Sequence, residues 1–165
     1  VLADGQHQRL SPQFYYYRNR LGLLGEWISS EQEVQVGSNA STHASLRNQA
    51  WQLTGSWVLT GEDGSYRGVV KPNHPFALDG EGWGAFELVA RYGELKIDED
   101  AFPVYADPSA SARRARAWGL GINWYLNSNL KLVMNYTDAD FDGGAPLGAD
   151  REGEQAIFSR LQVSF

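Results

Sequence analysis

The sequence of 165 residues contains no cysteine, so disulfide bonds and thiolate chemistry are excluded, whatever the redox state of the compartment. It contains no apolar run near the roughly 20 residues that a membrane-spanning helix needs. The opening stretch "VLADGQHQRL" lacks the basic and apolar regions of a secretory signal peptide. Basic charge is also scarce, with 14 Lys and Arg against 20 Asp and Glu, and the net charge of −6 argues against nonspecific nucleic-acid binding.

Glycine and aromatic residues, by contrast, are abundant. The 18 Gly, 6 Trp and 8 Tyr favour turns and aromatic-rich strands over a helical bundle. The final stretch "AIFSRLQVSF" places Leu161, Val163 and Phe165 on one face of a strand and Arg160 and Gln162 on the other. A membrane strand needs only about ten residues of such alternation, so hydropathy cannot distinguish a soluble β-protein from a membrane β-barrel.

Seven segments show this alternation, and each is bounded by Gly, Asn, Asp, Ser or Pro. They cover residues 10–18, 21–28, 48–60, 83–97, 116–126, 130–137 and 156–165. Most are longer than an ordinary strand of roughly 5 to 6 residues. Aromatic residues tend to lie near the ends of the apolar faces, as Trp51 with Trp57 and Trp118 with Trp124, which is typical of the aromatic girdles that flank a lipid-facing band.

The opposite faces of these segments are small or polar and carry single charges. The charged residues are Glu26, Glu87, Arg91, Lys131 and Arg160. Gly119, Gly121 and Asn123 would leave voids in a protein core, whereas they cost little facing a water-filled lumen. We therefore predict an all-β fold, an antiparallel transmembrane β-barrel. A soluble carbohydrate-binding β-sandwich is the alternative that the many Trp and Tyr support.

The lengths of the connections orient the predicted strands. Tight turns at 19–20 and 127–129 belong on the periplasmic side of an outer-membrane barrel, which keeps its longer loops outside. The loops expected outside the cell are residues 29–47, 98–115 and 138–154. Because successive strands alternate in direction, the long connection 61–82 is then expected on the periplasmic side. Because long structureless segments in compact domains are usually functional, we expect it to fold into the lumen and narrow it. Its basic side chains are Arg67, Lys71 and His74.

Several stretches, taken in order over residues 11–165, resemble one family. They are "YYYRNRLGLLGEWISSEQEV", "WVLTGEDGSYRGVVKPNHPF", "GWGAFELVARYGELKID", "AWGLGINWYLNSNLKLVMNYTDADFDGG" and "DREGEQAIFSRLQVSF". These are similar to the C-terminal part of the phosphate-selective porin O and P family. The resemblance implies a sixteen-stranded, trimeric barrel in the outer membrane of a Gram-negative bacterium that passes anions such as phosphate or polyphosphate. The strand with Leu161, Val163 and Phe165 then carries the signal read by the barrel-assembly machinery.

The number of predicted strands differs from that of a complete barrel. Seven strands are too few, and odd in number, for a closed single-chain barrel, which begins at eight. We therefore expect residues 1–165 to be the C-terminal part of one outer-membrane barrel domain, and completion by other chain segments is the alternative. The family's arginine ladder and phosphate-binding lysines lie mostly upstream of the matching region, so the resemblance does not assign them here.

The basic residues of the polar faces and of the long connection are the candidates for contact with permeating anions. They are Arg67, Lys71, Arg91, Lys131 and Arg160. We expect the last three to pair with Glu26 and Glu87 on the same faces, which would tune conductance without forming a site.

A second basic cluster, Arg113, Arg114 and Arg116, comes just before the fifth segment and is predicted at the extracellular rim. Functionally it would draw anions toward the mouth or pair with lipopolysaccharide phosphates, which suit guanidinium groups. The simpler interpretation is a solvated loop with carboxylates nearby. These carboxylates are Asp98, Glu99 and Asp100.

Other chemistry finds little support. The stretch "DADFDG" places Asp138, Asp140 and Asp142 as at the start of a calcium loop, but its twelfth position is Ala149 instead of Glu, so an acidic extracellular loop is preferred. The three His show no ligand spacing, and neither a "GxSxG" motif nor a phosphate-binding P-loop occurs. We predict that the protein is a passive anion channel rather than an enzyme, and that it binds no metal or cofactor. A non-conducting structural or adhesive barrel is the alternative.

Overall fold

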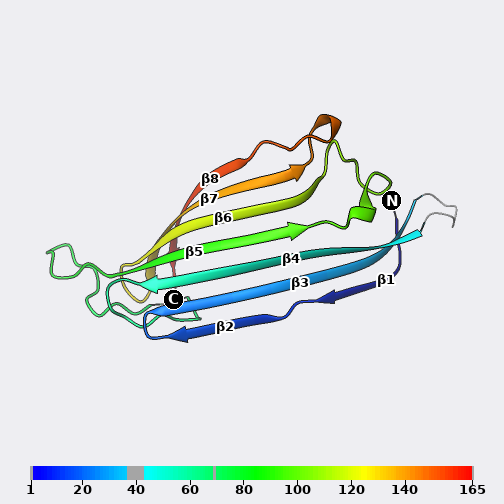
Figure 1. Ribbon diagram of the computed structural model, residues 1–165. Helices are drawn as coiled ribbons and strands as arrows, with labels where there is room; N and C mark the ends of the chain where they lie inside the picture. Colours follow the sequence, from blue (N-terminus) through cyan, green and yellow to red (C-terminus); the bar gives the residue numbers. More distant parts are fainter. Residues whose placement is uncertain (1, 37–42, 69, 165) are drawn as a thin grey trace.

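A computed structural model of the protein describes residues 2–36, 43–68 and 70–164. Its strands form one antiparallel sheet in the order β1-β3-β4-β5-β6-β7-β8, and β2 also pairs with β3 (Figure 1). The strands are β1 (Leu2–Leu10), β2 (Gln13–Arg18), β3 (Leu21–Gln35), β4 (His43–Val58), β5 (Ala85–Lys96), β6 (Ala112–Tyr125), β7 (Leu130–Gly143) and β8 (Glu154–Val163). Two short 3₁₀ helices are η1 (Glu99–Ala101) and η2 (Pro146–Gly148). No helix within the described ranges is long and apolar enough to cross a membrane. The predicted all-β antiparallel fold is confirmed.

β1 and β2 are two halves of one interrupted strand at the edge of the sheet. Leu10 lies opposite Ser29 and Gln13 opposite Glu26, so β2 continues the register that β1 has from His7 onward, after a register shift between Ala3 and His7. The interruption falls at Pro12, which has no N–H to donate to the ladder. The carbonyl of Pro12 still accepts a hydrogen bond from the backbone of β3. The sheet is therefore seven strands wide, as predicted, but its first strand begins well before residue 10.

Several strands extend beyond their predicted ends. The expected loop 29–47 shrinks to residues 36–42, and positions 37–42 of it lie outside the described residues. β6 begins at Ala112 rather than at residue 116, and β7 continues to Gly143. On these added ends the outer face becomes polar, as in the ion pair of Arg47 with Glu31 across β3 and β4, whereas apolar residues such as Val34 and Leu46 lie on the inner face. The apolar side of the alternation thus changes face toward these ends, so a pattern followed on one face stops before the strand does.

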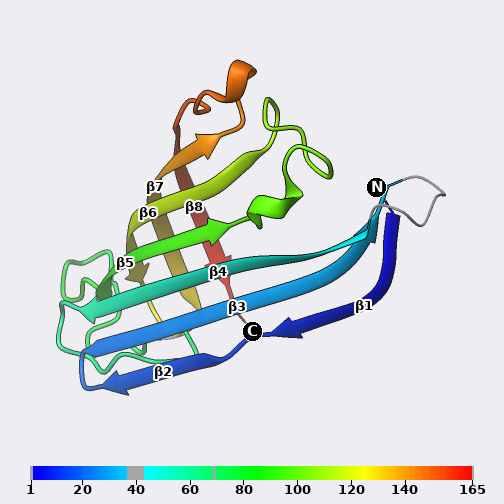
Figure 2. The same cartoon turned by 45° about the vertical axis from the view of Figure 1, so that its right-hand side comes forward.

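The two faces of the sheet differ sharply in composition. Residues that pair across an antiparallel ladder point to the same face, so the register assigns every strand residue to one side. The face that carries Trp51, Trp57, Trp118 and Trp124 is called the outer face here, and the opposite one the inner face. Figure 2 shows that the sheet is curled, with β8 passing behind β5.

Aromatic rings border the outer face at both ends, as the sequence predicts. Toward one end, Trp51 packs against Tyr92 with ring centroids 5.5 Å apart, and Trp118 against Tyr136 at 5.4 Å. Trp51 and Tyr92 belong to neighbouring cross-strand pairs rather than to the same pair, so the aromatic belt runs diagonally across the strands. Strands that are tilted from the membrane normal produce this diagonal. Toward the other end, Trp124 stacks on a ring of β5 at 5.6 Å.

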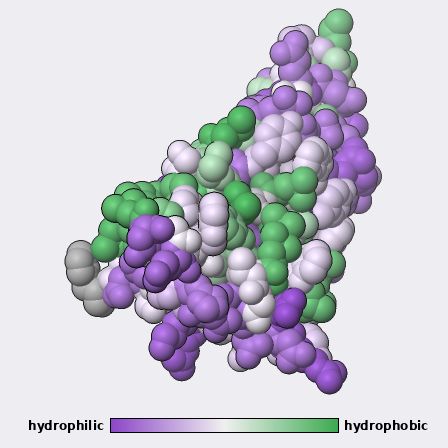
Figure 3. All heavy atoms as spheres, turned by 90° about the vertical axis from the view of Figure 1, so that its left-hand side faces the viewer, coloured by the Kyte–Doolittle hydropathy of each residue, from purple (hydrophilic) through white to green (hydrophobic). Residues whose placement is uncertain are grey.

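Apolar side chains between these belts are exposed rather than packed. Leu120 is 55% exposed, Ile157 75% and Leu161 64%, whereas only a few small clusters are buried. Figure 3 looks onto one end of the sheet and shows hydrophobic residues across the middle of this view, with hydrophilic residues around them. A soluble sandwich would bury such a face, whereas in a barrel wall it contacts lipid.

Candidate lumen-facing site

The inner face carries all five charges that the sequence places opposite the apolar band. Arg91 pairs across the ladder with Thr54 and Gly119, and the same parity connects Glu26 to Gln52. The register then assigns the remaining residues to this face. They are Glu87, Lys131 and Arg160. Many residues beside them are small or polar, such as Thr54, Gly119 and Asn123, as expected for a surface in contact with water.

The long connection between β4 and β5 folds over the inner face at one end of the sheet. Val70 is buried against Val58, Ala85 and Tyr125, which all have inner-face parity. The carbonyl of Gly68 accepts hydrogen bonds from the hydroxyl of Tyr125 at 3.3 Å and from Nζ of Lys131 at 3.0 Å. The connection therefore packs against the inner face of the sheet, the side that the predicted folding into the lumen requires.

The same connection reaches the opposite edge of the sheet. The ring of Tyr66 stacks on Tyr15 of β2 with centroids 4.2 Å apart, and contacts Tyr17 edge-on at 6.3 Å. The backbone N–H of Gly64 donates to the carbonyl of Asn19 at 2.7 Å. Because Gly68 contacts β6 and β7 only a few residues later, the segment spans the trough formed by the curled sheet.

A buried carboxylate anchors the start of this connection. Glu62 accepts hydrogen bonds from the hydroxyl of Thr60 and, at 3.0 Å, from the backbone N–H of Asn73. Burial by itself raises the pKa of Glu62, but these hydrogen bonds outweigh it and hold the pKa below its ordinary value. Glu62 is therefore ionised at neutral pH, and it ties both ends of a loop together.

The inner-face carboxylates take neutral hydrogen-bond donors, not the cations expected for them. Glu87 is buried and accepts from Nδ2 of Asn123 and from the hydroxyl of Tyr125, both at 2.8 Å. Glu26 accepts from Gln52 at 2.8 Å and also from side chains of the β1–β2 edge. No ion pair within 4.0 Å joins either carboxylate to a cation in the part of the chain that the structure describes. The predicted pairing is wrong, because short neutral side chains lie directly across the ladder.

Two of the three inner-face cations on the strands have no side-chain partner of this kind. The guanidinium groups of Arg91 and Arg160 are exposed and form no hydrogen bond, and no ion pair within 4.0 Å, with any other described residue. Lys131 is half-buried, with Nζ over the ring of Tyr125 at 5.1 Å from its centroid. Arg67 and Lys71 are exposed on the connection. The exposed guanidinium groups of Arg91 and Arg160 are therefore charged groups of this face that no side-chain hydrogen bond or close ion pair occupies among the described residues.

The predicted basic rim is part of β6 and is not a solvated loop. Arg116 lies in β6 on the outer face and pairs with Asp142 at 2.6 Å. Arg114 lies 3.9 Å from Glu94 and 3.8 Å from Asp142. Arg113 lies at a bulge with its guanidinium 6.0 Å from the centre of the Phe102 ring. The expected partners at 98–100 are replaced by strand residues.

The stretch "DADFDG" is part of β7 and forms neither a calcium loop nor an acidic extracellular loop. Asp138 accepts hydrogen bonds from the hydroxyl of Tyr136 at 3.1 Å and from Gln155 at 2.8 Å. Asp142 is the partner of the two outer-face arginines. These carboxylates belong to cross-strand pairs, so they do not surround one ion.

Two inner-face features escaped the sequence analysis. The first is the tyrosine set Tyr15, Tyr17, Tyr66 and Tyr125, whose signal was aromatic residues on the polar parity of β2 and β6. The second is η1 with the loop after it, where Ala101 of η1 is buried against Val34 and Leu46 at the other end of the inner face. Of the assembly-signal residues, Leu161 and Val163 are exposed on the outer face of β8, and Phe165 lies outside the described residues.

Comparison with known proteins is consistent with this architecture. The sequence model of a family described as phosphate-selective porin O and P matches residues 1–165. Porin O of Pseudomonas aeruginosa is 26% identical over 154 residues, which cover 87% of this chain and 34% of the relative. The chain thus spans about a third of the length of this curated relative.

Proposed function

Because this chain belongs to the phosphate-selective porin O and P family, we propose that it forms part of the wall of an anion-conducting porin in the outer membrane of a Gram-negative bacterium. Phosphate or polyphosphate is the proposed permeating solute. The observation that supports anion preference is the asymmetry of the inner face. Its carboxylates accept hydrogen bonds from neutral donors, whereas the guanidinium groups of Arg91 and Arg160 form no hydrogen bond, and no ion pair within 4.0 Å, with any described residue.

Passage requires that an ion be stabilised enough to enter but weakly enough to leave. A guanidinium on a polar wall replaces part of the hydration shell of an oxyanion, and exposure to water keeps that interaction modest. Tyr125 and Asn123 donate to the oxygens of the buried Glu87, so this carboxylate is stabilised without a cation beside it. The mechanism is electrostatic, and no residue of this chain needs to act as a catalyst.

We propose that the connection carrying Arg67 and Lys71 narrows the channel at its periplasmic end. It crosses the trough from Tyr15 to Lys131 and is held there by ring stacking and by two hydrogen bonds to the carbonyl of Gly68. Both basic side chains project from this bridge and are exposed, so they would meet an ion that passes beside it.

The remaining assembly follows from the same proposal. Residues 1–165 would be the C-terminal part of one barrel domain of sixteen strands, which is completed by upstream strands and associates as a homotrimer. The belt of Trp51 and Trp118 would lie at the lipid interface, with lipopolysaccharide around it. The outer face of β8, with Leu161 and Val163, would be recognised by the barrel-assembly machinery.

The testing experiment is the reversal potential of the full-length porin in a planar bilayer under a potassium chloride gradient, repeated with phosphate added. We expect anion selectivity and a chloride current that phosphate lowers. Cation selectivity would contradict the proposal. The absence of any conductance would favour a structural or adhesive barrel that is closed by its connections.

A further inference from the structure

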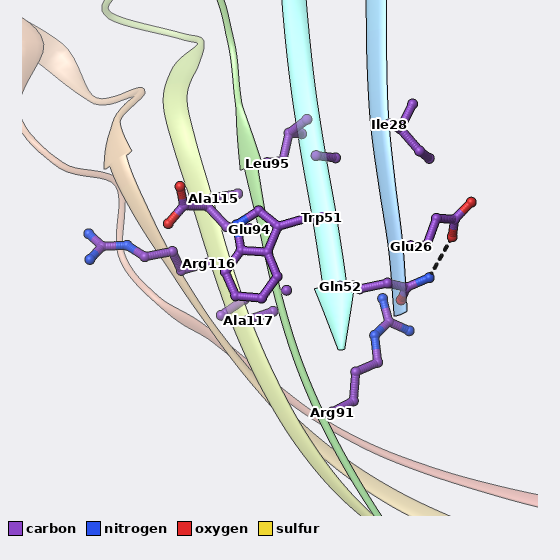
Figure 4. Close-up of a pocket in the computed structure, with 13 residues that line it drawn as sticks. Glu26, Ile28, Trp51, Gln52, Arg91, Glu94, Leu95, Ala115, Arg116 and Ala117 are labelled. Atoms are coloured by element: carbon purple, nitrogen blue, oxygen red, sulfur yellow. Dashed lines mark hydrogen bonds between the residues drawn. The ribbon is translucent and has the colours of Figure 1, made fainter. Parts of the chain in front are cut away.

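The inner face contains a pocket of about 320 Å³ that the charged wall does not explain. It lies beyond Arg91, on the side away from the long connection, and is shown in Figure 4. Most of its inner-face lining is small or apolar, with Glu26, Gln52 and Arg91 at one edge, while Glu94 and Arg116 line it from strand positions of outer-face parity. The residues that form most of this lining are Ile28, Ala50, Leu95, Ala115, Ala117 and Ala139.

Such a lining is unusual for a water-filled lumen, where polar side chains are expected. Two other apolar patches on the same inner face are covered by segments of this chain. Val70 covers the patch around Val58, and Ala101 covers the one around Leu46. The pocket between these patches stays open, and Leu95 within it is 42% exposed.

Charged groups at the edge of the pocket distinguish between kinds of ligand. In Figure 4, Glu26, Gln52 and Arg91 lie together below Ile28, and Gln52 donates to Glu26 at 2.8 Å. Ser11 and Gln13 also donate to this carboxylate, so its oxygens are occupied. Arg91 forms no hydrogen bond or ion pair with the described residues around it. The group available for a ligand is thus a cation beside an apolar surface.

We propose that this pocket is a subsite for an organic anion that carries an apolar group, such as an aryl or short alkyl phosphate or carboxylate. The anionic group contacts Arg91, and the apolar group lies against Ala117 and Leu95. The inference rests on the proposed anion channel and extends it, because it assigns the channel a solute class beyond inorganic phosphate.

The test compares phenyl phosphate with inorganic phosphate as blockers of the chloride current through the full-length porin. The two share their anionic group, so a difference between them reports the apolar contact. We expect phenyl phosphate to reach half-block at a roughly tenfold lower concentration, as burial of part of an aromatic ring implies. Ala117→Phe fills the pocket and should remove this difference while inorganic phosphate still blocks.

The matched control is Ala156→Phe, which adds the same ring to the inner face on β8 outside the pocket. It should leave the preference for phenyl phosphate intact. Arg91→Gln should weaken block by both anions to a similar degree. Correct folding of each variant is checked by its heat-modifiable mobility on gels.

Equal block by the two anions in an anion-selective parent channel would overturn the subsite and leave the proposed function standing. The pocket would then be occupied by another segment of the chain or lie outside the ion path. Loss of the preference in both Phe variants would also overturn it, because the contact would not be specific to the pocket. Cation selectivity of the parent would instead reject the proposed function itself.

Discussion

The arginines of the two faces differ in what surrounds them. Arg114 and Arg116 on the outer face have carboxylates beside them, with Arg116 at 2.6 Å from Asp142. Arg91 and Arg160 on the inner face have none within 4.0 Å among the described residues. The guanidinium groups of Arg114 and Arg116 thus lie beside carboxylates of their own face, whereas those of Arg91 and Arg160 do not. The same residue type pairs within the wall on one face, and on the other it is the group that the proposed function assigns to permeating anions.

The largest expected effect concerns the hydroxyl groups of the two faces. Tyr125→Phe removes a donor from the buried Glu87 and from Gly68, and we expect it to cost about 1–3 kcal/mol, because a buried carboxylate loses a hydrogen bond. Tyr136→Phe on the outer face removes a donor from Asp138, which lies in water-accessible surroundings, and should cost about 0.5–1 kcal/mol. Urea unfolding in lipid vesicles measures the loss of stability in both variants. Equal losses would contradict the expected difference between the inner-face and the outer-face hydroxyl group.

The second effect tests the arginines directly. Replacing Arg91 and Arg160 by Gln should lower the anion-to-cation permeability ratio by roughly fivefold to tenfold, because each charge contributes about 1 kcal/mol at 4 Å in water before screening. The matched control replaces Arg114 and Arg116 by Gln and should change the ratio less than about twofold. Reversal potentials measure both pairs. A similar change of the permeability ratio in both double variants would show that the face on which an arginine lies does not decide whether it affects ion selectivity.

The third effect concerns the bridge across the trough. Replacing Arg67 and Lys71 by Gln should lower the permeability ratio by about two- to threefold, because exposed charges on a solvated segment are screened over about 10 Å at 0.1 M salt. Lys96→Gln, on the outer face, is the control and should leave the ratio unchanged. An unchanged ratio in the double variant would place the bridge outside the ion path.

The smallest effect is expected from the outer-face ion pairs. Asp142→Asn removes the partner of Arg116, whose side chain is 40% exposed, and should cost about 0.2–1 kcal/mol because exposed ion pairs contribute little. The reversal potential should not change. A shift in selectivity larger than that of the Arg67 and Lys71 variant would mean that the outer pairs shape the lumen field.

The sequence allowed part of the candidate site to be predicted. Parity along each strand correctly assigned Arg91 and Lys131 to the face opposite the tryptophans, because side chains alternate with period two. The partners of these cations could not be predicted. Glu87 was expected to pair with a cation, but the register places Asn123 directly opposite it, and its other donor is Tyr125. Register depends on the whole sheet and not on one strand.

The sequence by itself determined the strand alternation, the two aromatic belts and the family resemblance, since each depends on residue types at short spacing. Only the tertiary structure decided where the strands end, how Arg114 and Arg116 are paired, and that Tyr66 carries the long connection across to Tyr15. Those features arise from contacts between residues far apart in the chain, and such contacts leave no local periodicity in the sequence.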